Sequence, residues 1–143
     1  MAQKREITRT DILPYEGYAG ERKSFKQKIA ALKARRRVEV GPFATFYFEN
    51  YDTMWHQVHE MLHIERGGEA QIKDELEAYN PLIPQGDELV ATVMFEIEDA
   101  ARRARELARL GGVEHKIYLA IGGERAMGVA DPTRENTSPE GKA

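Results

Sequence analysis

The clearest hydrophobic pattern in the chain is an alternation of apolar and polar residues from Glu88 to Ile97. One set of positions, if the segment is extended, shares a face: Leu89, Ala91, Val93, Phe95 and Ile97. The pattern therefore predicts a strand with one buried face. A second alternation, at Ile117, Leu119 and Ile121, predicts another strand. The expected core includes Leu89, Val93, Phe95, Leu119 and Ile121.

Segments with helical spacing of apolar residues lie before these two strands and between them. Phe25, Ile29 and Leu32 recur at intervals of four and three residues, which predicts a helix from about Tyr15 to Arg36, with Thr10 and Asp11 as its cap. Three further helices are expected over 53–66, 69–79 and 99–110, because Gly-Gly or Asn-Pro follows each of them. A strand, helix and strand over 88–121 would form a right-handed unit if the two strands were parallel.

Two short segments rich in β-branched and aromatic residues, 38–40 and 43–48, flank Gly41-Pro42. They predict either a hairpin or one bent strand. Taken together, the elements predict an α+β fold with a largely antiparallel sheet and helices packed on one face. The length of 143 residues fits one domain, expected over 1–131. Residues 132–143 lack an apolar period and are expected to form a flexible tail.

Composition narrows the classes of function. The chain has no cysteine, which excludes disulfides, a thiolate nucleophile and any metal site built on cysteine. No apolar run approaches the roughly 18 residues that cross a bilayer, and the first eleven residues are polar, so we expect a cytoplasmic protein without a membrane partner. Residues 1–40 hold 11 Lys and Arg against 5 Asp and Glu, a net charge of +6, which leaves −9 for the rest of a chain whose total is −3.

The helix expected at 52–66 concentrates the chemistry. His59-Glu60-Met61-Leu62-His63 matches H-E-x-x-H, in which two imidazoles one turn apart bind zinc and the Glu acts as a general base. At about 100° per residue, His56 shares with them roughly a third of the helix circumference. The candidate ligands of zinc or iron are therefore His56, His59, Glu60 and His63.

The pattern supplies no third ligand of the metzincin type, because Ile64 to Glu69 follows in place of the histidine extension. His56, Glu75 or Glu77 could complete the set if the next helix folds back. The alternative is that the histidines form the solvated face of an amphipathic helix, without a preformed third ligand.

Two further residues of this helix stand out. Glu65 falls, on the helical wheel, inside the apolar stripe of Met54, Val58 and Met61, so we expect a carboxylate that is at least partly buried and has a partner. The alternative is that the helix end has already reached solvent. Gln57 is the second candidate for a buried polar side chain.

A basic cluster, Lys33 to Arg37, ends the first helix. It complements the helix dipole and could also contact phosphates. Because the neighbouring aromatic residues resemble core positions, we expect Arg35 to Arg37 to be exposed and nucleic-acid binding to be at most weak.

Several segments together resemble a known family. They are Asp11 to Pro14, Lys33 to Pro42, Phe48 to Asn50, Gln57 to Glu65 and Ala78 to Pro84. Their order is similar to that in the uncharacterised bacterial family called domain of unknown function 3501, over most of residues 10–125. The resemblance implies that genes of this family lie near genes for rubrerythrin-like di-iron proteins and iron–sulfur oxidoreductases. It therefore implies a role in redox chemistry or oxidative stress.

The resemblance also bears on the candidate site. Family members keep the residues equivalent to Gln57, Glu60 and Glu65 more faithfully than both histidines, which argues against a shared zinc pair. Members continue into further strand-like sequence, so the resemblance implies a C-terminally truncated member. It assigns no catalytic residue.

Three functions follow as hypotheses. The first, from the resemblance, is an accessory protein of a rubrerythrin or iron–sulfur oxidoreductase system. The second is a His/Glu metal-binding protein that uses the helix at 52–66. The third is a weak nucleic-acid binder that uses Lys33 to Arg37.

Overall fold

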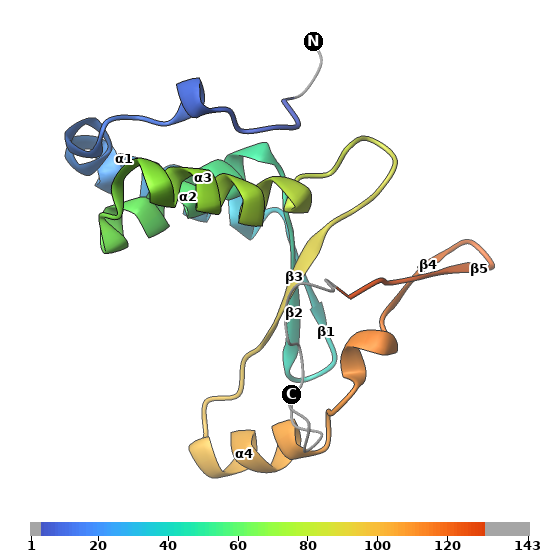
Figure 1. Ribbon diagram of the computed structural model, residues 1–143. Helices are drawn as coiled ribbons and strands as arrows, with labels where there is room; N and C mark the ends of the chain where they lie inside the picture. Colours follow the sequence, from blue (N-terminus) through green and yellow to red (C-terminus); the bar gives the residue numbers. More distant parts are fainter. Residues whose placement is uncertain (1–3, 131–143) are drawn as a thin grey trace. The chain divides into compact units, whose positions relative to one another are not determined.

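The computed structural model of the protein describes residues 4–130 (Figure 1). They fall into two compact units, one ending at Glu96 and the other beginning at Ile97. The expected tail, 132–143, lies outside the described residues, and a single domain over 1–131 stays a prediction. The expected α+β class is confirmed: helices accompany two small sheets, both of them antiparallel.

Three helices dominate the first unit: α1 (Tyr15–Ala34), α2 (Tyr51–Glu65) and α3 (Gly68–Tyr79). Asn50 caps α2, because its side chain accepts the Thr53 N–H at 2.9 Å while the Thr53 hydroxyl accepts the Asn50 N–H. Arg66 then takes a left-handed conformation (φ 53°) and ends the helix. None of the helices within residues 4–130 has the length and apolar content needed to span a membrane.

The expected cap of the first helix is wrong. Asp11 belongs to a separate 3-10 turn, η1 (Arg9–Asp11), where its carboxylate accepts the N–H of Thr8 at 2.9 Å. Helix α1 begins only after Pro14, which makes no side-chain cap. A Thr-Asp pair near a helix start cannot show from sequence which of two successive turns it closes.

The first sheet is a three-stranded antiparallel meander in the order β1 (Arg37–Val40), β2 (Ala44–Phe48) and β3 (Ala91–Phe95). Gly41, with φ of 63°, turns the chain between β1 and β2, so the hairpin is the correct alternative. In the observed register Val38 lies opposite Phe46, and Phe46 lies opposite Val93.

The core of the first unit lies between its helices and the N-terminal segment. It consists of Ile7, Ile12, Met54, Val58 and Ile83, surrounded by half-buried side chains of α2 and α3. The apolar stripe predicted on the helix at 52–66 therefore does face the core, through Met54 and Val58.

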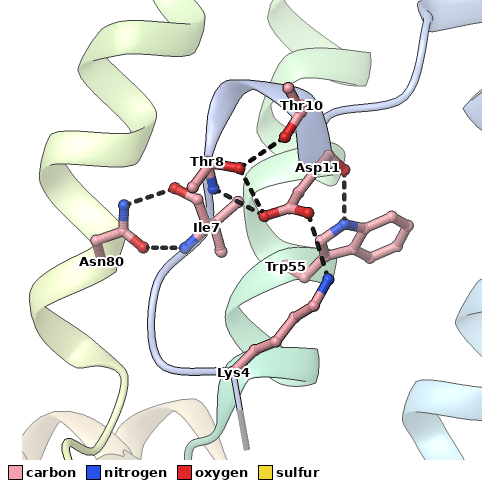
Figure 2. A network of polar contacts seen from close by, with 7 residues as sticks. All are labelled: Lys4, Ile7, Thr8, Thr10, Asp11, Trp55 and Asn80. Atoms are coloured by element: carbon pink, nitrogen blue, oxygen red, sulfur yellow. Dashed lines mark hydrogen bonds and ion pairs between the residues drawn. The ribbon is translucent and has the colours of Figure 1, made fainter.

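Residues 5–13 form what we call the strap, a segment that includes η1 and is held on the helices by polar contacts of its backbone (Figure 2). The side chain of Asn80 accepts the N–H of Ile7 at 2.7 Å and donates to the Ile7 carbonyl at 2.9 Å. The indole N–H of Trp55 donates to the Asp11 carbonyl at 3.0 Å. A short 3-10 turn, η2 (Asn80–Leu82), positions Asn80 after α3.

The second unit contains α4 (Ala100–Ala108), the 3-10 turn η3 (Val113–His115) and a hairpin of β4 (Tyr118–Ile121) and β5 (Glu124–Met127). Asp99 caps α4 by accepting the Arg102 N–H at 2.7 Å. Strands β3 and β4 belong to different sheets. The right-handed strand–helix–strand unit, which required these two strands to be parallel neighbours, therefore does not form.

The expected core positions on the strands are only partly correct. Val93 and Phe95 are half-buried, but Leu89, Leu119 and Ile121 are 65, 40 and 65% exposed. Alternation reports that a strand has an apolar face; it does not report that another element covers that face. Within residues 4–130, both sheets leave part of their apolar residues exposed.

Candidate functional site

Helix α2 carries its polar side chains on the face that packs against α1. The two helices run antiparallel, because Tyr15 at the start of α1 stacks on His63 near the end of α2, with ring centroids 5.2 Å apart. Phe25, further along α1, contacts Trp55 near the start of α2. The candidate histidines and Glu60 therefore lie in a helix–helix interface.

His59 is a buried histidine with both ring nitrogens engaged. Its side chain is 2% exposed and lies against Trp55 and Tyr18. The Leu13 N–H donates to Nε2 at 3.0 Å, and Nδ1 lies 2.8 Å from the Trp55 carbonyl, which places the proton on Nδ1. Burial lowers the pKa of His59, so the ring is neutral. It anchors the strap to α2.

Glu60 is an ion-pair centre. Arg22 donates to both carboxylate oxygens at 2.9 Å, and the Tyr18 hydroxyl donates to one of them at 2.6 Å. Lys26 approaches within 3.5 Å. These donors, Arg22 foremost, lower the pKa of Glu60 to about 2. The carboxylate is therefore ionised and fully bonded at neutral pH, and it lacks the proton affinity of a general base.

The other two histidines differ in burial. His56 is buried, and burial lowers its pKa, assisted by the charges of Lys33 and Lys26 and opposed by Glu60. His63 is half-buried between the rings of Tyr15 and Tyr18. The expectation that the three histidines form a solvated face is therefore wrong, because α1 covers that side of α2.

Of the four candidate ligands, His59 and Glu60 do not fit a zinc or iron site, whereas His56 Nε2 and His63 Nδ1 are buried without a hydrogen-bond partner in the described part of the chain. A metal needs a free lone pair from each histidine, whereas both nitrogens of His59 are hydrogen-bonded and Glu60 is held by Arg22. Within residues 4–130 no three His, Asp or Glu side chains gather in a way that would hold a metal ion. Glu75 lies instead within 3.4 Å of the Gln71 side chain.

The two remaining polar candidates on α2 are Glu65, at its end, and Gln57, near its middle. Glu65 is exposed, so its expected burial is wrong: α2 ends at this residue, and its last turn has reached solvent. Its carboxylate does have a partner, since the Gln71 amide donates to it at 3.1 Å. Gln57 is half-buried, and its amide lies 3.4 Å from the hydroxyl of Tyr79.

The residues of the basic cluster at the end of α1 differ in burial and in their partners. Arg36 is half-buried and donates to the Phe48 carbonyl at 2.8 Å, which ties α1 to the strand that precedes α2. Arg35 and Arg37 are exposed, as expected, and Arg37 pairs with Glu39 at 2.8 Å. The cluster therefore offers few uncommitted cations to a phosphate backbone.

Sequence reasoning missed the partners on α1. Tyr18, Arg22 and Lys26 recur at intervals of four residues and converge on Glu60. That spacing was visible in the sequence, but the apolar period of Phe25 and Ile29 marked a neighbouring face of the same helix.

The pKa shifts of His56 and His59 predict acid sensitivity. Both pKa values lie below the ordinary 6.5, so below that pH the unfolded chain takes up protons that the folded chain refuses. Stability is present above pH 6.5 and falls as the pH drops below it. Buried Glu49, whose pKa is raised, acts in the opposite direction. We expect His59→Gln to reduce the loss of unfolding free energy between neutral pH and about pH 5 by about 1 kcal/mol.

Urea denaturation across this pH range measures the loss. His115→Gln, which replaces an exposed histidine, is the control and should keep the slope of the parent protein. An unchanged slope in His59→Gln would mean that the buried ring does not resist protonation.

The three-stranded sheet has two chemically different faces. Cross-strand neighbours share a face. One face is apolar and consists of Val38, Val40, Ala44, Phe46, Phe48, Ala91, Val93 and Phe95. All of these side chains are exposed or half-buried, and Val40 is 52% exposed. The opposite face carries polar groups, among them the Tyr47 hydroxyl, which bonds Glu96 at 3.1 Å. We call the first of these the apolar sheet face.

Comparison with known proteins gives two findings. A family model described as "Protein of unknown function (DUF3501)" matches residues 6–143. The chain is also similar to a solved protein from Burkholderia pseudomallei K96243, described as a novel protein of unknown function. The two are 40% identical with a TM-score of 0.77, over 82% of this chain and 67% of the other. No curated protein matches the chain.

Proposed function

Because the chain belongs to the DUF3501 family of proteins of unknown function, we propose its function from its own surface: it is an accessory protein that binds a partner through the apolar sheet face. The observation that carries this proposal is the apolar sheet face itself. Exposed apolar patches with a polar surround are typical of surfaces that bind other proteins.

The chemistry of α2 supports a binding function over a catalytic one. His59 and Glu60 are engaged in contacts that hold the strap and α1 in place. Arg36 joins the end of α1 to the sheet through the Phe48 carbonyl, so the apolar sheet face is preformed beside the helices. A rigid, preformed surface lowers the entropy cost of binding.

The partner that we propose is a rubrerythrin-like di-iron protein or an iron–sulfur oxidoreductase, the company implied by the family resemblance. The chain would then act beside redox chemistry without holding the metal itself. The alternative of a nucleic-acid partner is less well supported, because Arg36 and Arg37 are already engaged.

A pair of matched variants tests the apolar sheet face. Val40 and Met94 are 52 and 51% exposed and lie on opposite faces of the same sheet. We expect Val40→Glu to weaken binding to the purified partner at least about tenfold, because a carboxylate would be desolvated in an apolar interface. Met94→Glu adds the same charge on the polar face and should leave the affinity unchanged.

Calorimetric titration of each variant against a rubrerythrin-like protein and an iron–sulfur oxidoreductase of the source organism gives the affinities. Equal losses in both variants would contradict a role for the apolar sheet face. Absence of binding to either protein class would contradict the proposed partners.

A further inference from the structure

Among the described residues, strand β1 is an edge strand whose outer hydrogen-bonding side faces no other strand. It pairs with β2 alone, and no other strand in residues 4–130 lies next to it. The Phe48 N–H donates to the Arg36 carbonyl at 2.9 Å. In an antiparallel pair, every second residue of a strand bonds toward the neighbouring strand, so this bond identifies which residues of β1 bond toward β2. Arg36, Val38 and Val40 therefore bond toward β2, and the N–H and C=O groups of Arg37 and Glu39 point away from the sheet.

The side chains on this edge have opposite charges. Arg37 and Glu39 are two residues apart and hence lie on the same face, where they form an ion pair at 2.8 Å. Both are exposed. Val38 lies between them on the other face, as part of the apolar sheet face.

We propose that a second copy of this chain pairs with β1 in antiparallel fashion, about a two-fold axis at Val38. In this register Arg37 of each copy lies opposite Glu39 of the other, and the outward backbone groups of both residues form the hydrogen bonds of the new ladder. A two-fold axis makes every contact twice, so a self-complementary edge is what this symmetry requires.

Charge selects this register over its neighbour. A shift of the axis to Glu39 would keep the backbone pattern but place the two Glu39 carboxylates opposite each other, which is unfavourable. The axis at Val38 pairs opposite charges at both positions. The edge thus specifies one alignment of the two copies.

The apolar sheet face supports the same arrangement. Val38, Phe46 and Val93 form a row across the three strands of one copy. In the dimer Val38 meets Val38 of the second copy, and the row continues without interruption across six strands. The pairing also covers an edge that would otherwise be open to unspecific strand addition.

Charge reversal gives a direct test by sedimentation equilibrium over a wide range of protein concentration. The parent chain should show a reversible monomer–dimer equilibrium. Arg37→Glu places carboxylates opposite each other at both positions, and Glu39→Arg does the same with cations. We expect each variant alone to dimerise at least about tenfold more weakly than the parent.

Two combinations control for misfolding. The mixture of Arg37→Glu with Glu39→Arg pairs opposite charges again and should form a heterodimer. The double variant carrying both substitutions is self-complementary and should form a homodimer. Arg35→Glu, an exposed charge reversal outside the strand, should dimerise like the parent.

A parent chain that remains monomeric throughout would overturn the proposal. So would single variants that dimerise like the parent, or a mixture and a double variant that both remain monomeric. Because Arg37 and Glu39 lie on the face opposite Val40, this test is independent of the test of the apolar sheet face.

Discussion

Asn80→Ala should lower the free energy of unfolding by about 3 kcal/mol, because it removes both backbone hydrogen bonds of a buried residue. Ile7 is 1% exposed, and its N–H and C=O have the Asn80 amide as their partner. An alanine leaves a donor and an acceptor without partners beside the core, and each costs about 1 to 3 kcal/mol. Urea denaturation followed by circular dichroism measures the loss.

Two controls separate this effect from the general loss of an amide. Gln85→Ala removes hydrogen bonds to the Arg5 and Ile83 carbonyls at an exposed position and should cost less than about 1 kcal/mol. Asn80→Asp keeps an acceptor for the Ile7 N–H but cannot donate to its carbonyl, and should fall between the two. An Asn80→Ala variant as stable as Gln85→Ala would show that the strap contributes little.

Glu60→Ala should also cost about 2 kcal/mol, because it removes one side of a half-buried ion pair and the acceptor of its donors. The substitution leaves the Tyr18 hydroxyl, which is buried, and the Arg22 guanidinium without their acceptor. Glu60→Gln keeps a neutral acceptor for both and should cost less. Thermal and urea denaturation give the free energies.

The comparison with Glu65→Gln distinguishes a structural from a surface role. Glu65 is exposed and has a single amide partner, so this variant should lie within about 0.5 kcal/mol of the parent. The lowered pKa of Glu60 predicts a pH dependence that can also be measured. The stability that ionised Glu60 contributes is complete above pH 4.5 and is lost as the pH falls toward 2. A Glu60→Ala variant with parental stability would contradict the ion-pair centre.

The helices could be predicted from local signals. Asn50 before α2 and Asp99 before α4 have side chains that favour helix starts, so these boundaries agree with the structure to within about two residues. Gly67 marked the end of α2, although the left-handed residue there is Arg66. The hairpin of β1 and β2 was one of two alternatives, because Gly-Pro marks a turn but not its geometry.

The environment of α2 could not be predicted from its own sequence. A helical wheel groups His56, His59 and Glu60 on one side but does not state what meets that side. The answer depends on α1 and the strap, which supply Arg22 and the Leu13 N–H. The same ambiguity affected the strands, where alternation at Leu119 and Ile121 did not imply burial.

The strap has a consequence for folding during synthesis on the ribosome. Ile7 is synthesised 73 residues before its partner Asn80. At about 5 to 20 residues per second, the N-terminal segment waits roughly 4 to 15 s before its binding partner has been synthesised. During that interval the backbone of Ile7 lacks its partner, so this part of the strap cannot take its final place until η2 has been synthesised.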